Sequence, residues 1–313
     1  MATVTKLKAA VNNKNLPILT SEGELTNYYV GMYLDKIEET GYSLSVSEKT
    51  AINAFIDSAI QNGYINYIQY MLPFIGDSSH SKAGIVPLID NVDNYEMSEY
   101  TGEEDYATNF FEYDSVTDKI KSVHNTRNTG DFIKTPISPS IQDNAVCIYL
   151  NANYETVAGV NIISTTEPAN NVEGTNYYLR FRYGVYENIP GALGLFNTTS
   201  PNLVMWSKFR KNVSTIVSNN YNANFGFALK NISGESKLHG WSDIEFTGYA
   251  DFGDDIITSA DKWLDLNYGK HTVGRNLSGM YLKTLIYLDL NIPKSSRQQL
   301  STDLFTLVTA LGR

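Results

Sequence analysis

The sequence predicts a mainly β protein, an antiparallel β-sandwich with an N-terminal helical segment and a C-terminal helix packed on the sandwich. Apolar side chains recur at helical spacing over residues 22–72, short alternating runs follow from 85 to 292, and helical spacing returns after Pro293. Many short strands separated by irregular Gly, Asn, Asp and Ser turns favour a sandwich over alternating β and α units. With 313 residues, of which 42% are hydrophobic and 19% charged, the chain can bury a core of this kind.

The first element is a polar arm at residues 1–20, either flexible or lying as a strap on a neighbouring subunit. Ser21 and Glu24 then have the spacing of a capping box, in which the two side chains bond to each other's backbone amides at a helix start. We therefore expect a helix over 22–40 that stops at Gly41. Its apolar side, which we predict to be a docking or oligomer face, consists of Leu25, Tyr28, Tyr29, Met32, Tyr33 and Ile37. The pattern leaves open whether this face packs within a subunit or between subunits.

A second capping box, Ser45 and Glu48, begins another helix, and Gly63 is its natural end. An apolar segment continues from there to Pro73, which interrupts it because proline lacks an amide donor. Together these elements define a helical docking segment over 21–76.

The strand region contains two long runs in which apolar and polar residues alternate, 177–185 and 280–290. Shorter runs occur at 146–150, 160–164, 203–209, 225–229 and 244–249. We assign residues 77–313 to one sandwich domain, which includes a terminal helix over 294–312.

The terminal helix has signals at both ends. Ser295 and Gln298 have the spacing of a cap at its start. Gly312 stands where a left-handed residue is wanted at its end.

Charge and hydropathy exclude several classes of partner. The formal net charge is −10, the sequence pI is about 4.9 and no run of basic residues is present, so we expect no nucleic-acid binding through phosphates. The N-terminus lacks the apolar core of a signal peptide, and no apolar run approaches the roughly 18 residues of a transmembrane helix. We therefore expect synthesis in a cytoplasm, no secretion and no membrane insertion.

Metal and cofactor chemistry has little support in the sequence. Acidic residues without any Lys or Arg gather between Ala83 and Asp118, where we expect a solvated face. Calcium is the alternative there, because that ion prefers carboxylate oxygens, although the spacing is not that of an EF-hand. The four histidines are scattered and form no pair at zinc-ligand spacing: His80, His124, His239 and His271. We expect no cofactor, with calcium left open.

The sequence gives little support for a catalytic motif. The sequence has no nucleophile elbow and no phosphate-binding loop. Its nearest match to the Glu-x-Asp-x-x-Glu strand of retaining glycoside hydrolases starts with Glu103 and Asp105 but has Thr108 at the acid/base position. We therefore predict that the chain is not an enzyme. If it binds carbohydrate instead, exposed aromatic rings would stack on the sugars, and Trp241, in a predicted loop, and Trp263 are the candidate glycan contacts.

Several segments together resemble one protein family. They are Ala51-Ile52, Leu72-Pro73-Phe74-Ile75-Gly76, Ser78-Ser79-His80, Gly191-Ala192-Leu193-Gly194-Leu195-Phe196-Asn197, Val273-Gly274-Arg275-Asn276 and Leu311-Gly312-Arg313. In this order they resemble tailed-bacteriophage virion structural proteins with a LamG-type, concanavalin-like jelly-roll domain, of the head-fibre or tail-fibre type. The chain departs from the family at residues 83–89, and its helix at 22–40 lies outside the pattern.

The resemblance implies a jelly roll displayed on a virion, as a head fibre, a tail fibre or a similar decoration. Its N-terminal part would dock to capsid or tail proteins and to identical subunits, after assembly in the host cytoplasm. The family has no fixed catalytic residues to transfer to this chain. The alternative function is a carbohydrate-binding adhesin that attaches the particle to host-surface glycans. A polysaccharide depolymerase is a third hypothesis, which would need a carboxylate pair facing one cleft.

Overall fold

A computed structural model gives the structure of the chain over sixteen ranges of residues. The described ranges are 17–19, 25–91, 99–101, 110–123, 132–134, 144–152, 161–165, 180–186, 189–196, 204–207, 221–232, 235–244, 248–256, 271–276, 280–289 and 291–313. Side chains are described for 27–91, 110–123, Asn224, 282–289 and 291–313.

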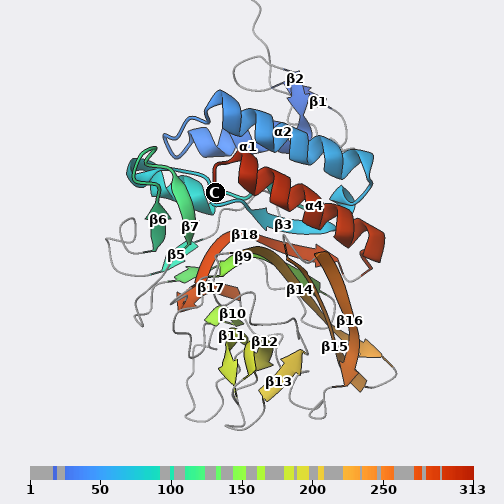
Figure 1. Ribbon diagram of the computed structural model, residues 1–313. Helices are drawn as coiled ribbons and strands as arrows, with labels where there is room; N and C mark the ends of the chain where they lie inside the picture. The colour runs from blue at the N-terminus through green and yellow to red at the C-terminus, as the bar shows by residue number, and fades with distance from the viewer. Residues whose placement is uncertain are drawn as a thin grey trace, which may run out of the picture.

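The elements form three layers (Figure 1). Helices α1 (Tyr28–Glu38), α2 (Val46–Gln61) and α4 (Lys294–Ala310) lie on one side of a large antiparallel sheet. Two smaller sheets lie on its other side. Helices thus form a full layer, and the arrangement combines α and β structure more evenly than the mainly β prediction implied.

The large sheet has nine strands, and every strand pair in it is antiparallel. Its main path runs in the order β16 (Gly248–Ile256), β15 (Glu235–Ile244), β14 (Tyr221–Ile232), β9 (Asn144–Ala152), β18 (Met280–Asp289), β3 (Ile68–Leu72) and β4 (Ile89–Asp90). The hairpin of β6 (Phe111–Tyr113) and β7 (Ile120–Val123) joins this sheet beside β18.

The smaller sheets are antiparallel as well. One contains β10 (Asn161–Thr165), β17 (His271–Asn276), β8 (Phe132–Lys134) and β5 (Glu99–Thr101). Another contains β11 (Arg180–Tyr186), β12 (Ile189–Phe196) and β13 (Val204–Ser207), and a short pair joins β1 (Pro17–Leu19) to β2 (Leu25–Asn27). The prediction of antiparallel sheets with helices near both ends is confirmed at this level, while the jelly-roll assignment stays a prediction.

The centre of the large sheet is buried on both faces. Met71 of β3 lies opposite Ile286 of β18, and both belong to the apolar core formed with the helices. Tyr70 lies opposite Tyr287 on the other face, where the two ring centroids are 6.3 Å apart and both side chains are buried. Cover on both faces explains why these two strands are apolar almost without interruption.

The first helix begins later than predicted. Helix α1 starts at Tyr28, and Asn27 caps it by accepting a hydrogen bond from the Tyr29 amide at 2.9 Å. Leu25 is part of strand β2, so the capping box at residues 21–24, which lies outside the described residues, does not begin this helix. The correction has a simple reason, because an Asn directly before the helix satisfies the same free amides.

The second and last helices follow the predicted boundaries more closely. The capping box of Ser45 and Glu48 is present at the start of α2, as predicted. Helix α4 begins at Lys294 after Pro293, without any side-chain cap, so the predicted cap is wrong. Gly312 has φ of +73°, the left-handed conformation expected after a helix end.

The segment before Pro73 is the main correction to the predicted helical segment. Only Ile65–Tyr67 forms a helical turn, a 3₁₀ turn, and the next five residues form strand β3. Pairing with β18 explains the difference, because a short apolar run adopts the structure whose backbone hydrogen bonds its neighbour completes.

Candidate functional site

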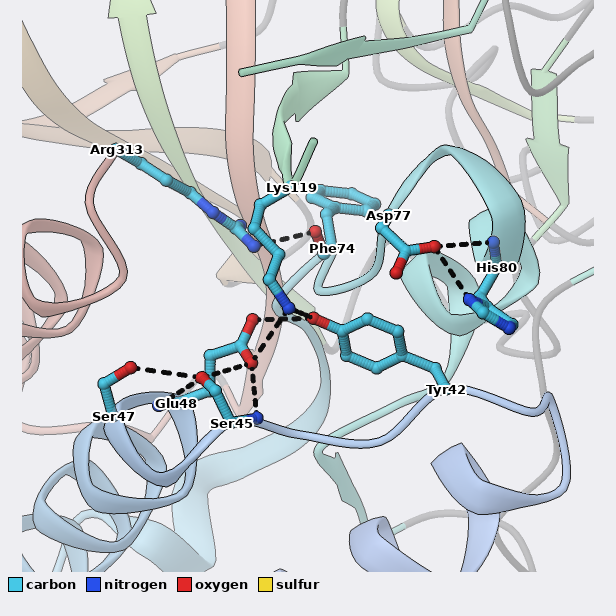
Figure 2. A network of polar contacts seen from close by, with 9 residues as sticks. All are labelled: Tyr42, Ser45, Ser47, Glu48, Phe74, Asp77, His80, Lys119 and Arg313. Carbon is cyan, nitrogen blue, oxygen red and sulfur yellow. Dashed lines mark hydrogen bonds and ion pairs between the residues drawn. The ribbon is translucent and has the colours of Figure 1, made fainter. Parts of the chain in front are cut away.

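A cluster of polar side chains lies where the start of α2 meets the strand β7 and the last residue of the sequence (Figure 2). We define it as the Glu48 cluster, made of Tyr42, Ser45, Glu48, Lys119 and Arg313. Its members come from the α1–α2 connection, from α2, from the residue before β7 and from the segment after α4.

The carboxylate of Glu48 accepts hydrogen bonds from two directions. Its Oε2 accepts from the Ser45 amide at 2.8 Å, and the Glu48 amide donates to Ser45 Oγ in return, which completes the capping box. The same Oε2 also accepts from Ser45 Oγ at 2.7 Å. Its Oε1 accepts from the hydroxyl of Tyr42 at 2.8 Å. Lys119 places its Nζ 3.4 Å from Oε2 and also donates to the Tyr42 hydroxyl. A carboxylate that is only 10% exposed thus gains two hydroxyl donors, an amide and a cation.

These contacts control the ionisation of Glu48 and Tyr42. Burial alone raises the pKa of Glu48, but hydrogen bonds from Ser45 and Tyr42 and the nearby charge of Lys119 outweigh it and hold the pKa below its ordinary value. The pKa of Tyr42 is raised, first by burial and then by its hydrogen bond to the negative Glu48. The cluster therefore holds a charged carboxylate and a neutral phenol at neutral pH.

Arg313 connects the last segment of the sequence to the turn after β3. Its Nη1 donates to the carbonyl of Pro73 at 2.7 Å. Its Nη2 donates to the carbonyl of Phe74 at 3.0 Å (Figure 2). Phe74 has φ of +52°, a backbone conformation that residues other than Gly rarely adopt. Two bonds from one planar guanidinium therefore hold a turn that the local sequence does not favour.

The guanidinium of Arg313 is buried although the residue as a whole is partly exposed. Burial lowers its pKa to about 10, and the negative charge of Glu48 opposes that shift. Tyr33 is nearby in the core, and burial raises the pKa of its phenol. Among the described residues neither the Tyr33 hydroxyl nor Arg313 Nε has a hydrogen-bond partner.

A histidine–carboxylate pair lies beside the cluster. The Asp77 carboxylate accepts from the His80 amide and lies 2.8 Å from His80 Nδ1. The His80 side chain is 37% exposed, and its ring centroid lies 6.0 Å from that of Tyr42. A Cβ on Gly41 would come within 3.2 Å of the His80 ring, so a glycine with φ of +85° lets the α1–α2 connection pass close to it. Asp77 therefore fixes His80 and caps the helical turn η2 (Ser78–Ile85).

A second carboxylate joins α2 to α4. Asp303 Oδ2 accepts from Tyr64 OH at 2.6 Å and from Ser58 Oγ at 2.7 Å, while Oδ1 accepts from Gln299 Nε2 at 3.0 Å. We call these four residues the Asp303 cluster. Asn224 of β14 donates to the Ser301 carbonyl and to Ser301 Oγ, which fixes α4 to the sheet.

The chemistry of both clusters is structural. Each polar group serves to cap a helix, to fix a turn or to join two elements. In the described part of the chain no three His, Cys, Asp or Glu side chains gather closely enough to hold a metal ion. Calcium stays a prediction for the acidic segment, part of which lies outside the described residues. No helix among the described residues has the length and apolar character needed to cross a bilayer.

The predicted docking face divides between the core and the surface. Tyr29, Tyr33 and Ile37 are buried in the apolar core of their own subunit, so they are not available to a partner. Tyr28 and Met32 are only partly buried, and the side chain of Leu25 lies outside the described set. The apolar side of α1 therefore packs against α2 and the sheet. Docking through the partly buried residues Tyr28 and Met32 stays a prediction.

The predicted glycan contacts fall on less described parts of the chain. Trp241 lies in strand β15, paired with Gly226 and Asp251, rather than in a loop. Its side chain, and all of Trp263, lie outside the described residues.

Sequence patterns found only part of the Glu48 cluster. Glu48 was recognised as a cap because its partner is three residues away. Arg313 belongs to one of the segments that resemble the phage family, but the resemblance did not say what its side chain contacts. Lys119 had no signal at all, since its contact with Glu48 spans 71 residues.

Comparisons with known proteins give distant structural similarity only. No protein-family model and no curated protein matches the sequence. A sialidase from Trypanosoma rangeli matches with a TM-score of 0.39 and 7% identity over 83% of this chain and 40% of that one. A tail fibre protein of a phage that infects E. coli matches with a TM-score of 0.27 and 13% identity, over 48% of this chain and 16% of the other. The catalytic domain of a glycoside hydrolase family 131 protein from Coprinopsis cinerea matches with a TM-score of 0.27 and 11% identity, over 52% and 63%.

The chain spans 40% of the length of the sialidase that it matches. At such scores the similarity assigns neither an activity nor a ligand to this chain.

The prediction that the chain is not an enzyme is corrected by these matches. The similar structures include sialidases and a glycoside hydrolase catalytic domain, so enzyme activity belongs among the functions to be tested. The reason for the error is physical. The missing Glu at Thr108 excludes one arrangement of carboxylates on one strand, whereas catalytic groups often come from separate strands that a linear pattern does not detect.

Proposed function

We propose that the chain is a structural component of a phage virion, a head fibre, a tail fibre or a similar decoration. Its arm at residues 1–20 and the surface of the helical layer dock to capsid or tail proteins and to identical subunits. The antiparallel sheets project outward from that layer. The protein is assembled in the host cytoplasm and ends in the virion.

One observation carries this proposal. Arg313 bonds to the carbonyls of Pro73 and Phe74 across 240 and 239 residues. Both partners belong to segments that resemble the phage family, the Leu72–Gly76 block and the closing Leu311-Gly312-Arg313. Their direct contact gives the two motifs one physical purpose, which is to hold the last helix and the turn after β3 together. This supports a static, displayed module.

The test uses particles of a phage whose genome encodes this sequence. Purified particles are digested and analysed by mass spectrometry, and an antibody against the recombinant chain is applied in electron microscopy. We expect peptides of the chain at a stoichiometry comparable to other minor virion proteins and antibody at a fixed site on head or tail. A DNA polymerase of the same phage serves as the control that must be absent. A chain found only in the infected-cell lysate would contradict the proposal.

The carbohydrate-binding alternative applies to the same sheets. The purified chain is screened on a glycan array, and each bound glycan is then analysed by mass spectrometry for shortened products. Trp241→Ala and Trp263→Ala should weaken binding if these rings stack on sugars, whereas Trp206→Ala is the matched control. Binding without products favours an adhesin, and products favour a glycoside hydrolase. If the chain neither binds nor shortens any glycan, the virion proposal stands without the carbohydrate-binding alternative.

A further inference from the structure

The strand β16 forms an end of the large sheet. It pairs with β15, from Gly248 opposite Ile244 to Ile256 opposite Lys237. Its other edge has no partner among the described strands. An edge of nine residues offers a full row of backbone donors and acceptors to another strand.

The charge of β16 selects which strand can pair with it. The strand contains Asp251, Asp254 and Asp255 and no Lys or Arg. Two copies of β16 placed edge to edge would bring these acids together, which is unfavourable for cross-strand neighbours. An incoming strand with Lys residues would be favoured instead.

The N-terminal arm has that complementary charge. Residues 1–16 include Lys6, Lys8 and Lys14 and no acidic residue, in a chain whose net charge is −10. Residues 3–11, Thr-Val-Thr-Lys-Leu-Lys-Ala-Ala-Val, contain no Gly or Pro and several β-branched residues, and they equal β16 in length.

We propose that residues 3–11 of one copy add as a strand to the edge of β16 in a second copy. The segment is followed after five residues by β1, which lies on the outer side of the helical layer, whereas β16 lies beyond that layer (Figure 1). Residues 12–16 span at most about 17 Å when extended, which favours a β16 edge presented by a neighbour over one reached past the helices. The pairing does not require a phage origin.

The proposal is tested by reversing charges in the full-length protein and measuring association by sedimentation velocity. Lys6→Glu with Lys8→Glu, or Asp251→Lys with Asp254→Lys, should each raise the dissociation constant about tenfold or more, because attraction becomes repulsion at two positions on one face of the sheet. The register shift in β16 brings Asp251 and Asp254 to the same face. Combining all four substitutions should restore association to within about threefold of the original. The same association should weaken as salt is raised from low to high concentration.

Matched controls exclude a general charge effect. Lys14→Glu lies in the arm but outside the paired stretch, and Asp57→Lys replaces an exposed acid on α2. Both should leave the dissociation constant within about twofold, and the thermal midpoint of every variant shows whether it still folds. A monomer at all concentrations, or a combined variant that does not recover, overturns the proposal. Hydrogen exchange then locates the arm: protection of β16 that is independent of concentration and lost without residues 1–16 means that the arm binds its own subunit, which also overturns it.

Discussion

The two carboxylate clusters of the helical layer have the same kinds of donor and different surroundings. Glu48 and Asp303 each accept a hydrogen bond from a tyrosine hydroxyl and from a serine hydroxyl. Glu48 also has Lys119 within 3.4 Å and the buried charge of Arg313 nearby. Asp303 has the neutral amide of Gln299. Both clusters therefore have hydroxyl donors, whereas the nearby cations are a feature of the Glu48 cluster.

The difference shows two ways to keep an acid inside a helical layer. At Asp303 the acid joins α2 to α4 through hydrogen bonds alone. At Glu48 the acid caps its own helix and its charge is balanced by Lys119, which comes from a distant hairpin. Removal of the acid should therefore have a larger effect at Glu48, because a cation loses its partner there as well.

The largest expected effect is that of Glu48→Ala. The substitution removes the Glu48 half of the capping box of α2, leaves the Tyr42 hydroxyl without its acceptor and takes the opposite charge away from Lys119, which should lower the free energy of unfolding by about 3 kcal/mol. Urea unfolding followed by circular dichroism measures it. Glu48→Gln is the control, which keeps one acceptor oxygen and should lose less. A loss below about 1 kcal/mol would show that the cluster contributes little to stability.

Asp303→Ala comes second. The substitution leaves the hydroxyls of Tyr64 and Ser58 without their acceptor and should lower the free energy of unfolding by about 2 kcal/mol. Asp303→Asn retains an acceptor and serves as the control in the same urea titration. If Asp303→Ala cost more than Glu48→Ala, the cations of the Glu48 cluster would not add to its stability.

Single hydroxyl deletions compare the shared donors directly. Tyr42→Phe and Tyr64→Phe each remove one bond to a carboxylate and should each cost about 1.5 kcal/mol. The bonds to the two carboxylates alone should cost similar amounts, and Tyr42→Phe also removes the hydroxyl that accepts from Lys119. Thermal unfolding of the two variants side by side checks this, and a cost at Tyr42 that is twice that at Tyr64 would assign the excess to the contact with Lys119.

Acid should weaken the Glu48 cluster in a defined pH range. The folded pKa of Glu48 lies below its ordinary value of 4.5, so the stabilisation is complete above that pH and is lost as pH falls through the folded pKa. The thermal midpoint should therefore fall more steeply for the wild type than for Glu48→Gln below pH 4.5. Parallel curves for the two proteins between pH 3 and 7, roughly the range over which carboxylates titrate, would contradict this.

The smallest expected effect belongs to a surface pair. Lys36 lies 3.1 Å from Glu39, with side chains 30% and 60% exposed. Lys36→Ala should change the free energy of unfolding by less than about 0.5 kcal/mol, because solvent screens exposed pairs. The same urea titration measures it, and a larger loss would mean that surface pairs and buried clusters cannot be ranked by exposure here.

Local sequence patterns predicted the ends of helices better than they predicted the contacts of the Glu48 cluster. The box of Ser45 and Glu48 could be predicted because its bonds span three residues. Arg313 could not be given a role, because its two acceptors lie 240 and 239 residues away. The same limit applies to Lys119, which no pattern within a short window connects to Glu48.

The sequence by itself determined the start of α2, the left-handed Gly312 after α4 and the antiparallel character of the β region, since each depends on contacts or periodicity within a few residues. Only the tertiary structure decided that residues 68–72 form a strand, that α1 uses Tyr29, Tyr33 and Ile37 inside the subunit, and that Arg313 holds the Phe74 turn. The physical reason is the same in each case. A short apolar or polar segment has several local conformations of similar free energy, and the partner that selects one of them lies far away in the sequence.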